Sequence, residues 1–462
     1  MSNSESYNRA LAQAHALARD YLHSLPERPV HARASLQALR AMAGAPLADA
    51  GQPAEAVLAH LDALGEAGSV ASAGPRYFGF VVGGSLPVAV AADWMVSAWD
   101  QNPGIQALSP FISVIEEVAG RELLALLDLP AGSGVGFVTG CQMANFTGLA
   151  AARHRLLARA GWDVNADGLN GAPELHVVIS EEAHVTIHTA LRYLGLGVRR
   201  AKRVAADGQG RMRPDALADV LAGCKGPTIV CAQAGNVNSG AVDPLDAIGA
   251  LCRAHGAWLH VDGAFGLWAR ASARHAELAR GAELADSWAT DAHKWLNVPY
   301  DCGIVIVRDA EAQRDAMAVR AAYLEHAASA ERDGFEYAPE FSRRGRAVPV
   351  YAALRQLGRS GVADLVDRCC AHARRFATVL ARAPGVVVLN DVVLNQVLVR
   401  FGESDDVTRE VISAVQKEGT CWLGGTVWRG QAAMRISVSN WSTTEADVDR
   451  SVAAILRCFR GL

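Results

Sequence analysis

The chain has 462 residues, of which 51% are hydrophobic and 20% charged, and its formal net charge at pH 7 is −4. These values exclude a disordered or fibrous chain and predict a compact globular protein with two or three structural units. The slight negative charge and the absence of long basic runs also argue against a nucleic-acid partner.

The N-terminal sequence differs from that of a secreted or membrane protein. It lacks the basic start, apolar core and small-residue cleavage site of a signal peptide, and no stretch reaches the ~18 uncharged apolar residues of a membrane span. We therefore expect a cytoplasmic protein without a membrane partner. The nine cysteines include no CxxC pair, and their odd number favours reduced thiols.

Three segments with different patterns follow one another along the chain. Residues 1–76 read as helices joined by turns, which predicts a helical arm. Residues 77–350 alternate short apolar runs with helical stretches, which indicates an α/β domain with a mainly parallel sheet covered on both faces. In residues 351–462, long helices flank three strand candidates, which predicts a small C-terminal α+β domain. The strand candidates of the large domain are GVGFVT, ELHVVIS, PTIVCAQ, AWLHVD, ADSWAT and CGIVIV.

Lysine is rare in this chain, since only four of its 44 basic residues are lysines. Three of them stand in solvated settings, but Lys294 lies in TDAHKWLNVPYDCG, directly after a predicted buried strand. A lysine amine can form an imine, whereas an arginine cannot. Lys294 is therefore a candidate Schiff-base lysine, and a lysine that extends from a surface loop is the alternative.

An imine lysine is how pyridoxal phosphate (PLP) is held, and PLP also needs an acid that keeps its pyridine nitrogen protonated. Asp262 ends the apolar strand in WLHVDGAFG, and open parallel sheets bind ligands at the carboxyl ends of their strands. Gly263 and Ala264 beside it leave room for a flat ring. The alternative is that Asp262 only caps the strand end.

The segment GVGFVTGCQMANFTGLAAAR predicts a strand, a turn of small residues and the start of a helix. Backbone N–H groups at a helix N-terminus bind phosphate. The segment is not a P-loop, because no GK[ST] follows. Its glycines also do not form the GxGxxG pattern of dinucleotide sites.

His184 follows another predicted strand, where its ring could stack on a cofactor. With His188 it also forms HxxxH, which on a helix can bind a metal. No glutamate follows His184 in the HExxH manner and no third ligand is evident. We therefore expect no metal.

In this order, the motifs resemble those of the group II PLP-dependent amino-acid decarboxylases, the family of the aromatic-L-amino-acid, glutamate and diaminobutyrate decarboxylases. The resemblance extends from GPRYFGF to MRISVSNWSTTEADVD and is most specific in HVDGAFG, DAHKWLNVPYDCG and SPFISVIEE. It implies the aspartate-aminotransferase fold (fold type I), PLP as the cofactor and an obligate homodimer with active sites at the interface.

The resemblance also implies roles for single residues. Lys294 would be the imine lysine, Asp262 the pyridinium partner, Ala264 a ring contact and His184 the stacking histidine. Many relatives have hydroxyl residues or glycine at the phosphate turn, where this chain has Cys141, Gln142 and Met143. The other implied cofactor contacts are Gly140, Cys141, Gln142, Ser287 and His293 for the phosphate, and Gln233 and Asn236 near the ring edge.

By the same resemblance, the reaction is decarboxylation of an L-amino acid to an amine and CO2. An aromatic substrate is favoured, because Tyr77, Phe78, Phe80, Trp94 and Trp99 could line an aromatic pocket. A decarboxylating aldehyde synthase or a carbon–carbon lyase on the same fold remains open. A catalytically silent PLP-binding subunit is a further alternative, which the joint presence of the lysine, the aspartate and the histidine disfavours.

Residues 326–346 are rich in small and charged residues, which predicts a mobile loop. In the related decarboxylases, a loop here closes over the substrate. Counting from YLEH places Tyr337 where those enzymes carry a tyrosine that protonates the carbanion, and a phenol can deliver such a proton in a closed, dry site. The alternative is an ordinary loop aromatic.

Overall fold

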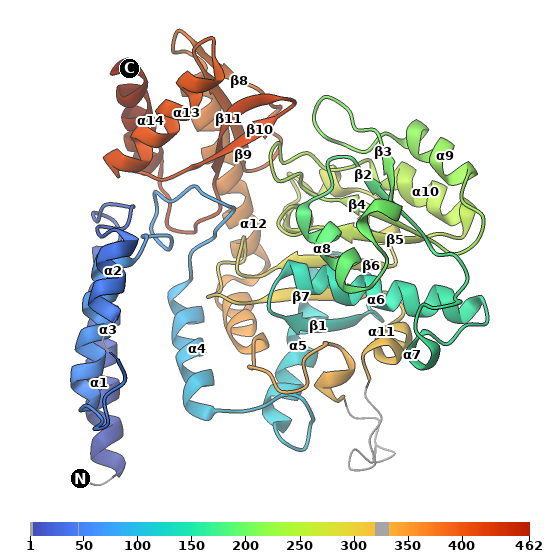
Figure 1. Cartoon of the computed structure of the whole chain (residues 1–462), viewed down its shortest axis with the longest axis horizontal. Helices are drawn as coiled ribbons and strands as arrows, with labels where there is room; N and C mark the ends of the chain where they lie inside the picture. The colour runs from blue at the N-terminus through green and yellow to red at the C-terminus, as the bar shows by residue number, and fades with distance from the viewer. Residues whose placement is uncertain (1–2, 45, 319–331) are drawn as a thin grey trace.

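A computed structural model describes residues 3–44, 46–318 and 332–462 of the chain. Two sheets organise these residues, a seven-stranded sheet in the larger part and a four-stranded sheet in the C-terminal part. Figure 1 shows the larger sheet with its helices on one side of the molecule, the smaller sheet beside it and the N-terminal helices along one edge.

The seven-stranded sheet has the order β1-β7-β6-β5-β4-β2-β3. Its strands pair in parallel except at β7, which runs antiparallel to both of its neighbours. This confirms the predicted α/β fold with a mainly parallel sheet. The strands are β1 Gly134–Val138, β2 His176–Ser180, β3 Lys202–Val204, β4 Thr228–Gln233, β5 Trp258–Asp262, β6 Ser287–Asp291 and β7 Gly303–Val307.

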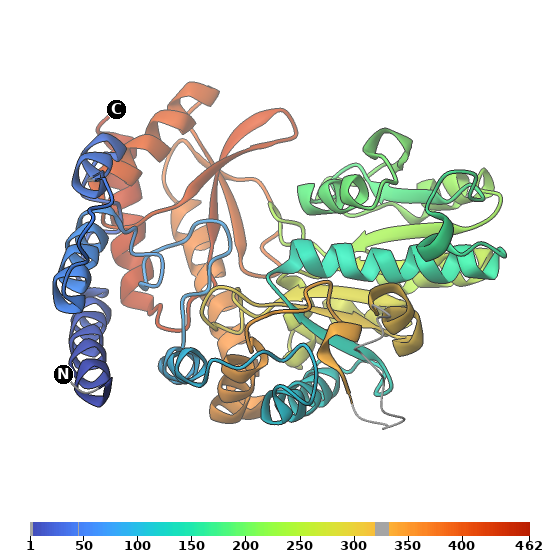
Figure 2. The ribbon, with the colours of Figure 1, turned by 60° about the horizontal axis from the view of Figure 1, so that its bottom comes forward.

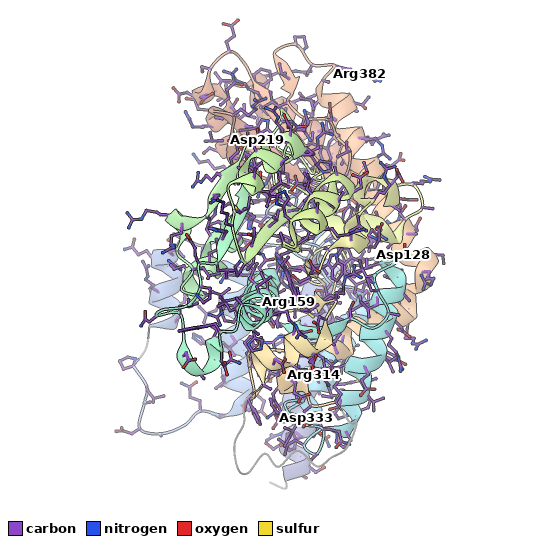
Figure 3. All side chains as sticks on the ribbon, turned by 90° about the vertical axis from the view of Figure 1, so that its right-hand side faces the viewer. Asp128, Arg159, Asp219, Arg314, Asp333 and Arg382 are labelled. Atoms are coloured by element: carbon purple, nitrogen blue, oxygen red, sulfur yellow. The ribbon has the colours of Figure 1, made fainter. Side chains whose placement is uncertain are left out.

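Helices cover both faces of this sheet, and every residue of β1, β4, β5, β6 and β7 is buried. Separate apolar clusters contain α6 and α8 on one side and α5, α9 and α10 on the other. Charged side chains such as Asp128, Arg159 and Arg314 lie on the outside (Figure 3). The helices are α5 Pro110–Leu126, α6 Cys141–Arg159, α7 Val164–Asp167, α8 Val185–Tyr193, α9 Pro214–Ala222, α10 Leu245–His255 and α11 Ala310–Met317.

The C-terminal part contains an antiparallel sheet of order β10-β11-β9-β8. The long helix α12 connects it to the larger part and is kinked at Gly358, where φ is 59°. A capping box at Thr444 begins the last helix. The elements are α12 Ala347–Leu380, β8 Val386–Val388, β9 Gln396–Phe401, α13 Asp405–Glu418, β10 Gly424–Trp428, β11 Gln431–Ser437 and α14 Glu445–Arg460.

The first helices form an arm with little core of its own. They are α1 Asn3–Ser24, α2 Leu36–Ala43 and α3 Ala54–Gly68, followed by α4 Pro87–Trp99. No residue of α2 or α3 is buried, and Figure 2 shows the arm on the outside of the molecule. None of the helices in the described ranges is long and apolar enough to cross a bilayer. The boundaries proposed at residues 76 and 350 stay predictions.

Candidate active site

Three neighbouring strands of the large sheet end in polar side chains at the same edge. β4 ends at Gln233, β5 at Asp262 and β6 at Asp291. These strands are parallel, so their carboxyl ends meet where α/β sheets bind ligands. Lys294 follows β6, and its Nζ lies 3.1 Å from Asp291 Oδ2. The sheet therefore brings the predicted lysine and the predicted acid to one edge.

Lys294 is a largely buried amine whose charge is balanced by carboxylates. Its side chain is 18% exposed, and that of Asp291 is 3% exposed. Burial acts to lower the pKa of the Lys294 amine, but Asp291 and Asp262 favour its charged form and the net effect raises the pKa. The amine is thus held as an ammonium group, which must lose a proton before it can act as a nucleophile.

Asp262 is buried, and both of its carboxylate oxygens accept hydrogen bonds. Oδ1 accepts the Ala264 N–H at 3.2 Å and the Cys141 thiol at 3.4 Å, while Oδ2 accepts the Asn145 amide at 3.1 Å. Burial and the nearby carboxylates raise the pKa of the Cys141 thiol, so that thiol remains a donor. Asp262 is therefore a fixed acceptor in the interior and not an exposed strand-end cap.

His184 forms the N-cap of α8. Its Nδ1 lies 2.8 Å from Thr186 Oγ1, and the same hydroxyl oxygen accepts the Asn145 amide at 3.2 Å. Burial lowers the pKa of the His184 imidazole, so the ring is neutral. It is connected to Asp262 through Thr186 and Asn145. The described residues contain no group of three metal-ligating side chains that would include His184 and His188.

The predicted phosphate turn and His293 converge on the Asp291 carboxylate. The first N–H of α6, that of Cys141, donates to Asp291 Oδ1 at 2.6 Å, and the N-cap is Gly140. His293 Nε2 lies 3.4 Å from the same oxygen, while its Nδ1 accepts the Cys302 N–H at 3.1 Å. Since Nδ1 is an acceptor, the neutral imidazole carries its proton on Nε2. In this structure both donors are therefore directed at the Asp291 carboxylate of the protein itself.

Four other predicted cofactor residues have different placements. Gln233 is buried opposite Asp262 in the sheet, and Gln142 is half-buried in the first turn of α6. Asn236 Oδ1 accepts the N–H groups of residues 238 and 239 and so shapes its own turn. Ser287 is the first residue of β6, and Asp291 is the last. In an extended strand of this length the two ends are about 13 Å apart. The predicted phosphate contact of Ser287 is wrong, because Ser287 lies at the amino end of its strand.

Tyr337 lies near the β1 edge of the sheet. The Arg332 guanidinium lies 3.7 Å from the centroid of the Tyr337 ring. The Tyr337 carbonyl oxygen accepts a hydrogen bond of 2.9 Å from the Gln313 side-chain amide. Arg332 also donates to a carbonyl of β1, two strands away from β6. These contacts hold Tyr337 against the scaffold of its own chain, and its role as the proton donor stays a prediction. Residues 326–331 of the predicted loop lie outside the described residues.

Three side chains at this site, Asp291, Asn145 and Arg435, were not predicted from the sequence. The first two stand inside the motifs quoted above, but their partners are distant in the sequence. Arg435 comes from β11 and is half-buried, and its charge acts to lower the pKa of His184. Burial also lowers the pKa of Arg435 itself, and no described carboxylate counters this effect. The sequence signal for Arg435 is its position as a charged residue in the predicted strand MRISVSN.

These donors and acceptors fit PLP. A lysine amine can form its imine, a buried carboxylate can face its pyridine nitrogen, and an imidazole can stack on its ring. The chain matches the pyridoxal-dependent decarboxylase conserved domain over residues 39–401. The chain belongs to this family. The family uses PLP, which confirms the predicted cofactor, and its members are amino-acid decarboxylases of the group that the motifs resemble.

Relatives and solved structures agree with this assignment. The acidic amino acid decarboxylase GADL1 of Mus musculus is 30% identical over 329 residues, which are 70% of this chain and 59% of that protein. The aromatic-L-amino-acid decarboxylase of Bacillus atrophaeus is 28% identical over 80% of this chain and 78% of that protein. The crystal structure of mouse CSAD matches with a TM-score of 0.92 at 23% identity over 100% of both chains. This last likeness confirms the predicted fold.

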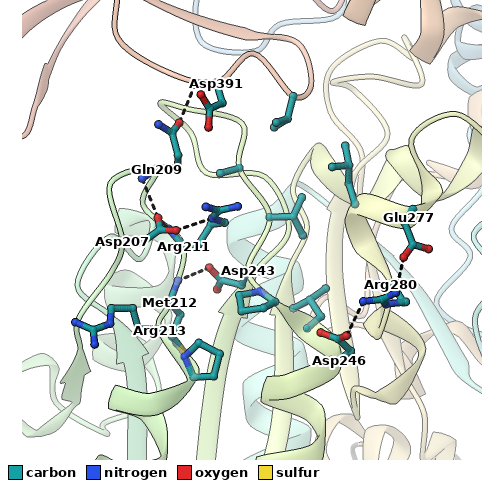
Figure 4. A pocket seen from close by; sticks show the side chains of 17 residues that line it. Asp207, Gln209, Arg211, Met212, Arg213, Asp243, Asp246, Glu277, Arg280 and Asp391 are labelled. Atoms are coloured by element: carbon teal, nitrogen blue, oxygen red, sulfur yellow. Dashed lines mark hydrogen bonds and ion pairs between the residues drawn. The ribbon is translucent and has the colours of Figure 1, made fainter.

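A separate pocket at the end of β4 is shown in Figure 4. Most of its charged groups are satisfied within the protein. Arg211 pairs with Asp207 at 2.7 Å, and Arg280 pairs with Asp246 at 3.0 Å. Asp243, whose pKa burial raises to about 7, accepts the N–H at the end of β4 and that of Met212. This pocket therefore supports the scaffold next to Gln233, while the chemistry lies at Lys294.

Proposed function

We propose that the chain converts an L-amino acid to the corresponding amine and CO2, with PLP held by Lys294. The observation that carries the proposal is the convergence of the Lys294 amine, the buried Asp262 carboxylate and the neutral His184 ring at one edge of the sheet. When bound, PLP supplies an electron sink for the bond that breaks. The chain supplies the attachment, the orientation and the proton transfers.

Each residue has a role that follows from its contacts. Lys294 attaches the cofactor, and Asp291, at 3.1 Å, can take the proton that the amine must lose. Asp262 would hold the proton of the pyridine nitrogen. His184 would stack on the ring, and its neutral state avoids a second positive charge there. The turn at Gly140 and Cys141 that begins α6 would lie against the phosphate, and for this the Cys141 N–H and His293 Nε2 would have to exchange their contact with Asp291 for one with the phosphate.

Arg435 would bind the carboxylate of the substrate. Its guanidinium stays charged at neutral pH, and its charge reaches His184. A half-buried cation at an active site attracts an anionic group, and guanidinium matches a carboxylate in a two-bond geometry. Because Arg435 comes from the C-terminal part of the chain, substrate binding would bridge the two sheets.

We propose an aromatic substrate, because exposed aromatic rings flank Lys294. Tyr300 is 62% exposed and stacks on His293 with ring centroids 4.2 Å apart. Phe80 is 61% exposed and packs on Trp422 at 5.4 Å. Three residues later, a Cβ on Gly83 would lie 1.6 Å from the Lys294 carbonyl oxygen, so this segment packs against the backbone of Lys294. Such rings favour an aromatic side chain over an acidic one.

We also propose that the chain forms a homodimer through the arm. Leu11 and Leu61 are 61% and 57% exposed, and Trp94 is 43% exposed. Leu61 and Trp94 line a groove between α1, α3 and α4, which places Trp94 away from Lys294. Exposed apolar patches mark protein interaction sites, and a second copy of the chain is the occupant that the resemblance implies.

The test compares wild type with Lys294→Ala and Lys294→Arg after incubation with PLP. We expect the wild type to show a cofactor absorption band that borohydride fixes to the protein, and to release CO2 from aromatic amino acids. Both variants should lose the fixed band and the turnover while keeping the circular-dichroism spectrum of the wild type. Normal CO2 release by Lys294→Arg would overturn the proposal, because a guanidinium cannot form the imine.

The products distinguish the decarboxylase from the aldehyde synthase. One equivalent of amine for each CO2 supports the proposed reaction. Aldehyde, ammonia and hydrogen peroxide as the main products would move the chain to the other class. A panel that includes glutamate and diaminobutyrate tests the aromatic preference in the same assay.

A further inference from the structure

A continuous chain of hydrogen bonds reaches Asp262 from the amino end of β6. Trp258 Nε1 lies 2.9 Å from Ser287 Oγ, and that oxygen lies 2.8 Å from His260 Nδ1. His260 Nε2 lies 2.9 Å from Asn145 Oδ1, and Asn145 Nδ2 lies 3.1 Å from Asp262 Oδ2. All five side chains are at most 4% exposed, so the chain runs entirely through the interior.

The ends of this chain fix the direction of every bond. The Trp258 indole can only donate, and the Asp262 carboxylate only accepts. The Asn145 amide must therefore turn its NH2 group to Asp262 and its oxygen to His260. It follows that His260 carries its proton on Nε2 and accepts the Ser287 hydroxyl at Nδ1. Each of the five groups is satisfied in one arrangement only.

The state of His260 agrees with this direction. Burial lowers its pKa to about 4, so the imidazole is neutral over the whole physiological range. A neutral imidazole has one donor and one acceptor, which the chain requires. A charged imidazole would carry a proton on Nδ1 as well. Its Nδ1 could then no longer accept the hydrogen bond from the Ser287 hydroxyl.

The His260 ring packs against a glycine of α6. Gly148 lies in α6 where the imidazole passes, and a Cβ there would be 3.0 Å from His260 Cε1. Any larger residue at position 148 would push the ring. The small residues of α6 therefore allow a polar side chain of β5 to reach Asn145 one turn earlier in the helix.

Asn145 also connects this chain to the second ligand-facing residue. Its Nδ2 lies 3.2 Å from Thr186 Oγ1, which lies 2.8 Å from His184 Nδ1. One amide group thus contacts both the acid that would face the pyridine nitrogen and the threonine that orients the stacking imidazole. A shift of Asn145 would move both groups together.

We propose that Trp258, Ser287, His260 and Asn145 form a positioning relay that sets the orientation of Asp262 and His184. This rests on the proposed function, since Asp262 and His184 are the groups that would contact PLP. It gives Ser287, at the amino end of β6, a role other than the phosphate contact that the sequence predicted. The relay acts through Asp262, so its members are positioning residues and make no contact with the cofactor.

The experiment uses full-length protein loaded with PLP and compares wild type, Asn145→Ala, Ser287→Ala and the double variant. Loss of a supporting partner of this kind costs on the order of 10- to 100-fold in activity. We expect Asn145→Ala to lower kcat by that amount with KM nearly unchanged. Ser287→Ala should lower kcat less. The double variant should have the kcat of Asn145→Ala, because without Asn145 the Ser287 hydroxyl is no longer connected to Asp262 and its loss has no further effect.

The cofactor spectrum provides the readout that separates positioning from mere stability. Ser287→Ala and Asn145→Ala should both shift the pH midpoint of the PLP absorption band, in the same direction. The matched control is Ser113→Ala, a buried serine whose hydroxyl has no partner among the described residues, and it should leave the band in place. If Ser287→Ala does not fold, Trp258→Phe removes the first donor and keeps an aromatic ring.

The outcomes separate the relay from the proposed function. If the wild type shows no PLP band that depends on Lys294, the proposed function fails and the relay with it. If that band is present but Ser287→Ala and Trp258→Phe both superimpose on the wild type in band and kcat, only the relay is overturned. Additive losses in the double variant would also overturn it.

Discussion

The Lys294 site and the N-terminal arm depart in opposite directions from the rule that polar groups face water and apolar groups do not. At the site, Asp262, Asp291 and His293 are each less than 10% exposed. In the arm, Leu11 and Leu61 are more than half exposed. Buried charge and exposed hydrocarbon are both costly in an isolated chain. Both departures are typical of regions that bind, and the proposed function assigns a charged small molecule to the site and a second copy of the chain to the arm.

The two regions also differ in how their contacts are made. The site groups are held by directed hydrogen bonds from strands β5 and β6 and from α6, which fix atoms to within narrow limits. The arm helices α2 and α3 bury no residue. Changes at the site should therefore alter chemistry without altering assembly, and changes in the arm should act on assembly first.

The largest effect is expected for Asp262→Asn. The neutral amide cannot hold the pyridine proton, so we expect kcat to fall by on the order of 100-fold or more, with PLP still bound and the oligomeric state unchanged. Steady-state CO2 release and the absorption spectrum measure this. Asp219→Asn on the surface (Figure 3) is the matched control. A wild-type rate in Asp262→Asn would mean that Asp262 has no part in the chemistry.

Arg435→Met should weaken substrate binding. A hydrogen bond to a charged group contributes about 1.5–3 kcal/mol, so we expect KM for the amino acid to rise by roughly 10- to 100-fold. Arg409→Met, which removes an exposed arginine of α13, should leave KM unchanged. The product amine, which lacks the carboxylate, should inhibit wild type and Arg435→Met equally. A selective loss of amine binding would remove Arg435 from carboxylate recognition.

Leu11→Glu combined with Leu61→Glu tests the arm. Burial of one leucine contributes about 1.5–3 kcal/mol, so we expect the dimer dissociation constant to rise at least about 10-fold. Sedimentation velocity would then show a species of 48.8 kDa at concentrations where the wild type is dimeric. Asp20→Asn, an exposed residue of α1, is the control. A wild-type chain that is monomeric and fully active would contradict the homodimer.

The smallest effect is expected for Asp291→Asn, and it concerns proton affinity. Burial lowers the pKa of the Lys294 amine while Asp291 raises it, so removal of the Asp291 charge should lower that pKa. More of the amine is then unprotonated at pH 7, and the pH at which the imine with PLP forms should move down. The pH dependence of PLP capture by borohydride measures this, with Asp406→Asn as an exposed control. A midpoint that stays in place or rises would show that Asp291 does not control Lys294.

Local sequence determined the elements whose pattern is contained in one strand or turn. The parallel sheet followed from short apolar runs between helices, because strands buried on both faces need apolar residues throughout. Asp262 and Lys294 could be identified because each follows such a run, and the carboxyl ends of parallel strands share an edge of the sheet. The antiparallel direction of β7 was not predicted, since its apolar sequence reads alike in either direction.

Tertiary structure alone decided which distant residues meet. Asn145 and Asp262 are 117 residues apart, and Arg435 belongs to a different sheet. Tyr337 is a further example, because counting along the chain predicted only a role for it, while its contacts with Arg332 and Gln313 at the β1 edge come from the tertiary structure. The sequence by itself determined the reactive groups and the strands that carry them. Their partners depended on strand order and helix packing, which arise from contacts between segments that no local pattern encodes.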